Sequence, residues 1–136
     1  MAPVSAGARP ARRPRGLAEK LGAIVLGFEA IVVALGGLTI YGLRVLPEGV
    51  EPWWAIVGGG VVAVTMIVTA GLLAKRAGVV LGWILQVIVL ASALLVPAML
   101  VIALIFGGMW AYAMIAGGRV DRAAARRSSG HEPLQT

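Results

Sequence analysis

The sequence predicts an all-α membrane protein, with four transmembrane helices in a compact bundle and both termini cytoplasmic. Of the 136 residues, 60% are hydrophobic and 13% are charged. A soluble domain has about 45–50% apolar and about 25% charged residues, so this composition is typical of a membrane protein. Most of the charges lie in residues 1–20, in one short turn and in residues 118–136. They therefore lie at the two ends of the apolar domain, residues 21–117, and in one turn of it, which is the distribution expected on the cytoplasmic side of a membrane protein.

Residues 1–20 form a basic arm that we expect to be disordered. The arm carries five positive charges and three prolines, and it has too little apolar surface to fold alone. A secretory signal is the alternative interpretation. The apolar stretch that follows is too long for one, contains Glu29 and has no Ala-x-Ala-like cleavage site.

The apolar domain divides into four predicted spans, at about 21–43, 54–74, 79–95 and 98–116. A helix needs roughly 20 residues to cross a ~30 Å hydrocarbon core. The uncharged tract after Arg76 is about twice that length, so we divide it in two. Pro97 marks the division, because proline removes a helix donor and suits a tight reversal at Val96-Pro97-Ala98.

Charge counting sets the predicted orientation, since positive charges near span ends favour the cytoplasmic side. With four spans, eleven positive charges share one side and Arg44 alone lies on the other. A three-span topology would move the four tail arginines to the outer side. We therefore expect both ends inside, a plasma-membrane location and a basic, polar cytoplasmic tail over 118–136. Aromatic residues lie near both predicted interfaces, as belts do: Tyr41, Trp53, Trp54, Trp83, Trp110 and Tyr112.

Small residues recur at helical spacing along the spans, as expected where helices approach closely in lipid. The predicted packing positions are Gly27, Ala30, Ala34, Gly59, Ala63, Gly78, Gly82, Gly107 and Gly108. We interpret them first as contacts within the bundle. A homo-oligomer face is the alternative.

A polar layer is predicted in the cytoplasmic half of the bundle. At 1.5 Å per residue, Glu29 and Gln86 each lie about 12 Å inside their spans, and Thr65 and Trp110 lie at about 10–14 Å. No lysine or arginine shares this depth, so Glu29 is expected to be protonated or to bond to Gln86. The layer is either a hydrogen-bonded clasp of Glu29, Gln86 and Thr65 or an ionisable functional site.

With these residues placed, the chain resembles a family of small, uncharacterised actinobacterial membrane proteins classed as a domain of unknown function. The resemblance runs from Arg15 to Arg127. It is carried by "RGL", "LGFEAIVV", "KRAGVVLGWILQV" and "FGGMWAY". It implies four membrane helices, with no known activity, substrate or catalytic residue. Genes of that family often lie beside the gene of folylpolyglutamate synthase, a hint about pathway that is no evidence of folate chemistry.

Two functions remain open on the sequence alone. The first is a structural or accessory protein that binds a membrane partner or itself through small-residue faces. The second is a small proton-coupled transporter using Glu29. Small multidrug transporters are similar in length and in having one first-span glutamate, but they lack so strong a charge bias.

Catalysis is not expected, and no metal or cofactor is predicted. The chain has no cysteine, its one histidine is in the tail, and Ser92 has no histidine or lysine near it. The basic ends are expected to contact anionic lipid headgroups, with no nucleic-acid partner.

Overall fold

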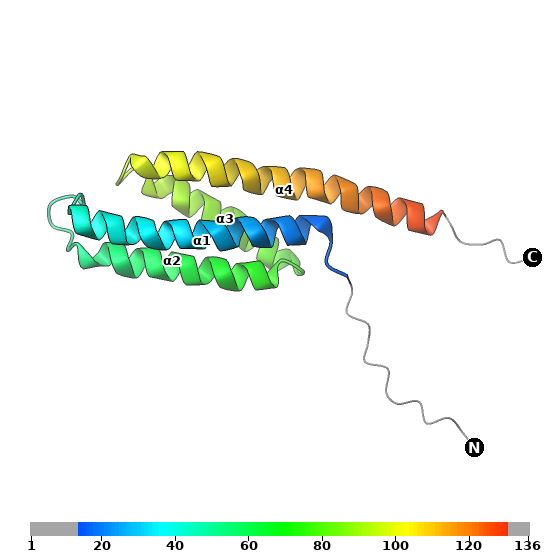
Figure 1. Cartoon of the computed structure of the whole chain (residues 1–136), viewed down its shortest axis with the longest axis horizontal. Helices are drawn as coiled ribbons and strands as arrows, with labels where there is room; N and C mark the ends of the chain where they lie inside the picture. Colours follow the sequence, from blue (N-terminus) through cyan, green and yellow to red (C-terminus); the bar gives the residue numbers. More distant parts are fainter. Residues whose placement is uncertain (1–13, 131–136) are drawn as a thin grey trace, which may run out of the picture.

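The computed structural model describes residues 14–130, which form four helices running alternately up and down (Figure 1). No strand occurs among these residues, so the all-helical prediction is confirmed for them. Residues 1–13 of the predicted arm and residues 131–136 of the predicted tail, His131 among them, lie outside the described residues. The helices are α1 (Leu17–Leu43), α2 (Trp53–Leu72), α3 (Arg76–Ser92) and α4 (Ala98–Ser129).

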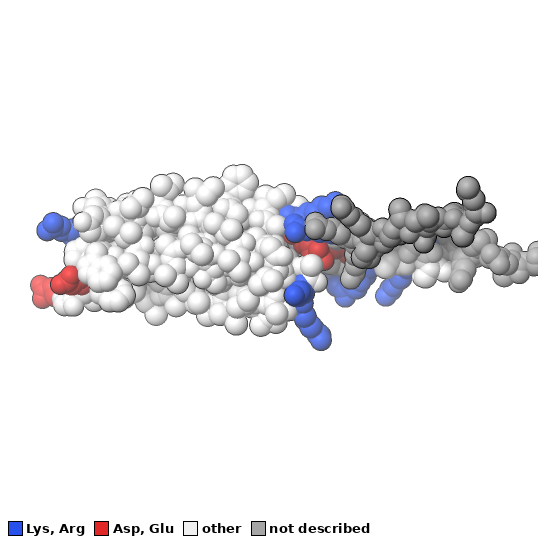
Figure 2. Space-filling view, turned by 90° about the horizontal axis from the view of Figure 1, so that it is seen from below, with Lys and Arg blue, Asp and Glu red and all other residues white. Residues whose placement is uncertain are grey.

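Three of these helices, α1, α2 and α4, are long and apolar enough to cross a membrane. The fourth, α3, has 17 residues and is shorter. Figure 2 shows an uncharged band between two charged ends on the face in view. Large apolar side chains such as Phe28, Ile67 and Leu104 are more than half exposed on the outer faces. A water-soluble bundle would bury such residues, so the outer faces of these helices are suited to contact lipid.

The helices form a ring in which α1 packs against α2 and α4, and α3 packs against the same two helices. Helices α1 and α3 therefore lie on a diagonal of the bundle. The centre is filled from all four helices, and its residues include Leu26, Met66, Leu85 and Trp110. We call the end with the α1–α2 loop the Arg44 end, and the end with the α2–α3 turn the Lys75 end.

At the Lys75 end, α1 begins at Leu17, four residues before the predicted boundary. The Asp121 carboxylate of α4 accepts hydrogen bonds from the backbone N–H groups of Leu17 (2.7 Å) and Ala18 (3.1 Å). These two amides lack partners within their own helix, so the carboxylate caps α1. Close approach is possible because Gly117 has no side chain: a Cβ there would lie 2.7 Å from the Ala18 Cα. Residues 17–20 are helical and do not belong to a disordered arm.

The two connections at the Arg44 end differ in length and position. Arg44 ends α1 in the left-handed conformation, with φ at 52°, and the loop to α2 turns again at Gly49, with φ at 93°. Helix α3 ends at Ser92, three residues before the predicted end, and an apolar turn leads to α4. As a result, the α1–α2 hairpin projects beyond the α3–α4 turn (Figure 1).

Candidate functional site

The centre of the candidate site is a hydrogen bond between Glu29 and Gln86. Gln86 Nε2 donates to Glu29 Oε2 at 2.6 Å. Glu29 is fully buried and Gln86 is 8% exposed. Because Glu29 is on α1 and Gln86 is on α3, the bond joins the two helices that face each other across the bundle diagonal.

Trp110 closes the site on the side of the Lys75 end. Its indole ring lies over two glycines: a Cβ at Gly82 would be 2.2 Å from the ring, and a Cβ at Gly22 would be 3.2 Å from it. Gly22 precedes Glu29 on α1 by about two turns, and Gly82 precedes Gln86 on α3 by about one turn. Trp110 is 0% exposed. Its assignment to an interfacial aromatic belt is therefore wrong.

Thr65 does not bond to Glu29. Its hydroxyl donates to the carbonyl oxygen of Val61 in its own helix at 2.7 Å. The fully buried threonine of α2 is Thr69, whose hydroxyl donates to the Thr65 carbonyl at 2.7 Å. The predicted polar layer did not include Thr69. No signal in the sequence distinguishes it from Thr65, because the rotation of α2 about its axis is set by packing.

Three buried polar atoms have no hydrogen-bond partner among the described residues: Glu29 Oε1, Gln86 Oε1 and Trp110 Nε1. A carboxylic acid at Glu29 supplies an O–H donor, and the Gln86 Oε1 is an acceptor. An acid and a primary amide can therefore pair through two hydrogen bonds, of which the 2.6 Å contact is one. A second bond of this kind would remove part of the cost of burying these atoms.

The site has little beyond this pair to support chemistry. No set of three histidine, aspartate or glutamate residues that could hold a metal ion occurs among residues 14–130. The hydroxyl groups of Thr65 and Thr69 on α2 already donate hydrogen bonds to backbone carbonyl oxygens. What the arrangement provides is a fixed, polar cross-link between helices.

The predicted packing residues divide into two groups. Ala30 and Ala63 are buried, and Ala34 packs against the core. Gly78 and Gly82 leave no room for a Cβ, and a Cβ at Gly59 would be in tight contact, at 3.2 Å. A Cβ at Gly107 would lie 3.5 Å from Gln86 Oε1, an ordinary contact. Nothing lies within 4 Å of such a position at Gly27 or Gly108, so these two do not make close helix contacts within the chain. Sequence reasoning missed the tight contacts of Gly22 and Gly117.

A cavity of about 280 Å³ occupies the other half of the bundle, toward the Arg44 end. All four helices and the α1–α2 loop line it, and the lining is almost entirely apolar. It reaches Val33 and Val89, which are about one turn from Glu29 and Gln86 on their helices. The polar pair itself is not part of the lining.

The comparisons with curated proteins and with solved structures give no match. The comparison with protein families gives one, over residues 20–126. That segment holds the polar pair, Trp110 and the cavity. The chain therefore belongs to the family described as "Protein of unknown function (DUF4233)".

Proposed function

We propose that the protein is a structural or accessory membrane protein, which binds a membrane partner or a second copy of itself and does not transport a solute. The observation that carries the proposal is the closed Glu29–Gln86 hydrogen bond. The bond links diagonal helices, both partners are buried, and Trp110 closes one side. Such a bond stabilises a bundle in lipid by about 1 kcal/mol, and it fixes the register of the helices.

A transport role would need Glu29 to exchange protons with one side of the membrane or the other. Relays of this kind in membranes use chains of titratable groups or water-filled paths. The core of the bundle includes the fully buried Leu26, Met66 and Trp110 on three different helices, and Glu29 is the one buried titratable group among residues 14–130. This packing favours the structural role.

The outward faces supply the surface for a partner. The glycines in tight contacts are used inside the bundle, whereas Gly27 and Gly108 leave backbone open to a neighbouring helix in lipid. The basic residues at the ends suit anionic headgroups at the cytoplasmic surface. Copurification from native membranes, followed by mass spectrometry, would identify the partner; a chain recovered alone and monomeric would count against this role.

We further propose four spans in the cell membrane, with both termini cytoplasmic. At 1.5 Å per residue the 17 residues of α3 extend about 26 Å, near the lower limit for a span. The described charges support the same topology, because they gather at the two ends (Figure 2) and all the described basic residues except Arg44 lie at the Lys75 end, with the first and last described residues. Reporter fusions after Pro47, Arg76 and Thr136 test it: the first is expected outside and the other two inside. The opposite result at any of the three would contradict the topology.

The alternative is a small proton-coupled transporter. The cavity favours it, because its lining comes within about one turn of Glu29 and Gln86. An apolar solute in this cavity would lie close to an ionisable group.

The Glu29→Gln variant separates the two functions. An amide at residue 29 still pairs with the amide of Gln86 but has no proton to exchange. The structural role predicts normal thermal stability in detergent and normal growth under acid or toxic-cation stress. Glu48→Gln, which changes an exposed carboxylate outside both the cavity and the depression, is the matched control. A Glu29→Gln protein that folds normally but loses a growth phenotype would establish the transporter instead.

A further inference from the structure

We propose that the Arg44 end binds one phospholipid with an amine-bearing, zwitterionic headgroup, such as phosphatidylethanolamine. One acyl chain lies in the cavity between the helices, and the headgroup lies over Arg44 and Glu51. This site goes beyond the accessory role and does not depend on Glu29.

The cavity fits an apolar chain. Ser92 is the one polar side chain in its lining, and its hydroxyl already donates to the Val89 carbonyl at 2.5 Å. The remaining lining is aliphatic or aromatic, as at Val62, Ile88 and Met99. An apolar cavity of ~150 Å³ is enough to hold a benzene molecule, and this one is about twice as large. In a bilayer, the apolar molecule that surrounds the helices is the lipid acyl chain.

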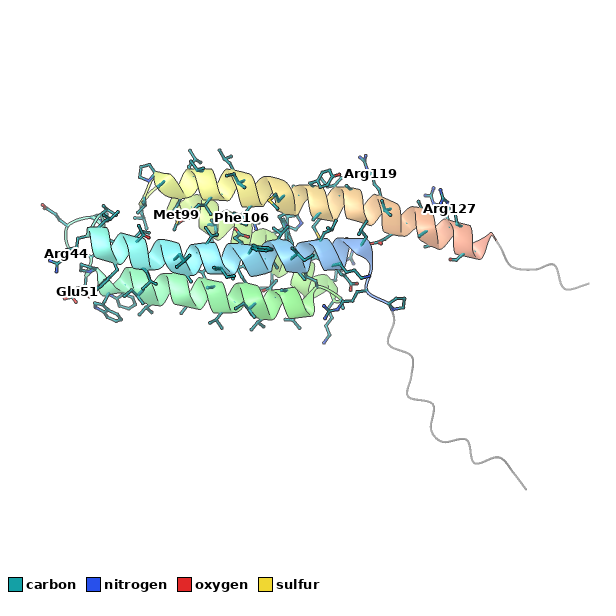
Figure 3. The ribbon with its side chains drawn as sticks, in the orientation of Figure 1. Arg44, Glu51, Met99, Phe106, Arg119 and Arg127 are labelled. Atoms are coloured by element: carbon teal, nitrogen blue, oxygen red, sulfur yellow. The ribbon has the colours of Figure 1, made fainter. Side chains whose placement is uncertain are left out.

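The cavity exists because of how the four helices end. Gly37 and Gly59 hold α1 and α2 in backbone contact near the Arg44 end: a Cβ on Gly59 would lie 3.2 Å from the Gly37 Cα. Helix α3 stops at Ser92, so the α3–α4 turn does not cover the projecting hairpin (Figure 1). The space between hairpin and turn is lined from both sides, by Trp54 and by Met99 among others (Figure 3 labels Met99).

A second, open depression adjoins the cavity and carries the charges that a zwitterionic headgroup needs. Its lining includes Arg44 and Glu51, which Figure 3 places together at this end of the bundle. Val50 lines both the depression and the cavity. The guanidinium of Arg44 suits a phosphate group. Glu51 Oε2 accepts a bond from Trp53 Nε1 at 3.0 Å, so its Oε1 is available for an ammonium group.

Two tryptophans connect the depression to the cavity. The rings of Trp53 and Trp54 stack with their centroids 4.5 Å apart. Trp53 lines the depression and Trp54 lines the cavity. Tryptophan is enriched at the level of lipid headgroups, where its ring is in apolar surroundings and its N–H is near polar groups. The stacked pair thus marks the depth at which a headgroup continues into an acyl chain.

Native mass spectrometry of the purified full-length chain tests the site, with phosphatidylethanolamine or phosphatidylglycerol added in detergent. Gly58→Leu is expected to abolish tight binding, because Gly58 lines the cavity and a Cβ there meets nothing within 4 Å. Gly60→Leu is the matched control: it is equally open but lies outside the lining, so it should bind as wild type does. Equal binding by the two leucine variants would show annular lipid only and would overturn the proposal.

The headgroup assignment is tested in the same experiment. Arg44→Asn removes the cation but tolerates the left-handed backbone, and it should weaken binding about tenfold, the loss expected for one hydrogen bond between charged groups. Arg127→Asn, at the other end, is expected to leave binding unchanged. Wild type should prefer phosphatidylethanolamine, and Glu51→Gln should lose that preference. Equal affinity of wild type for the two lipids would overturn the assignment. Glu29→Gln should bind lipid normally, which separates this test from that of the proposed function.

Discussion

The two halves of the bundle differ in how their helices meet. Toward the Lys75 end, Leu26, Met66 and Trp110 are fully buried, and a ring from one helix occupies the space that two glycines leave on others. Toward the Arg44 end, α1 and α2 remain in contact, but a cavity of about 280 Å³ separates them from the α3–α4 hairpin. One half is suited to holding the fold together, and the other is suited to admitting a ligand.

The difference has a local origin in the lengths of the elements. Asp121 ties the start of α1 to α4 at the Lys75 end, where a Cβ at Gly22 of α1 would also meet Met114 of α4 and Leu73 at the end of α2. At the Arg44 end the short α3 stops before the hairpin does. Figure 3 shows how far α4 continues beyond the bundle at the Lys75 end, through Arg119 to Arg127.

The largest difference in the free energy of unfolding is expected between alanine variants of two methionines, one in each half. Met66→Ala removes a fully buried side chain from the packed half and is expected to cost about 2–5 kcal/mol in the free energy of unfolding. Met99→Ala should cost distinctly less, because Met99 already borders the cavity and loses fewer contacts. Unfolding in mixed micelles by added SDS measures both. Equal losses would show that the halves are packed alike.

The next largest difference in stability is expected between alanine variants of two glycines, Gly82 and Gly108. A Cβ at Gly82 would lie 2.2 Å from the Trp110 ring, so Gly82→Ala is expected to destabilise the fold by about 1–3 kcal/mol. Gly108→Ala meets open space and should be neutral or stabilising by up to ~1 kcal/mol, since alanine favours the helix. The thermal midpoint in detergent checks the pair. A stable Gly82→Ala protein would contradict the close packing of Trp110.

The cap on α1 should have a smaller effect. Asp121→Ala removes the acceptor of two backbone N–H groups and is expected to cost about 0.5–2 kcal/mol. The loss should be local, so amide hydrogen exchange should rise at Leu17 and Ala18 and remain low at residues near Gln86. Unchanged exchange at the start of α1 would show that the carboxylate does not cap the helix.

The sequence predicted the helices and the depth of Glu29 and Gln86, because both follow from apolar length and from the rise per residue. It did not predict the rotation of each helix about its axis. Thr65 and Thr69 are one turn apart on α2, and only the packing of α2 shows that Thr69 is the one that lies inward. The same limit applies to Gly27. Its spacing predicted a helix contact, but nothing among the described residues lies within 4 Å of a Cβ at this position.

Features that depend on contacts between distant parts of the chain could not be predicted from the sequence either. The start of α1 at Leu17 depends on Asp121, more than a hundred residues later. The cavity depends on where α3 ends relative to the α1–α2 hairpin. Neither leaves a periodic signal in the residues concerned.

A double-mutant cycle on Glu29 and Gln86 tests the central claim most directly. Glu29→Leu, Gln86→Leu and the double variant are compared with wild type by SDS unfolding in mixed micelles. If the buried bond is a structural clasp between α1 and α3, the two residues should couple by about 1 kcal/mol, with each single leucine variant leaving an unpaired polar group. Strictly additive effects of the two substitutions would show that the bond contributes nothing to the fold and would contradict the structural role.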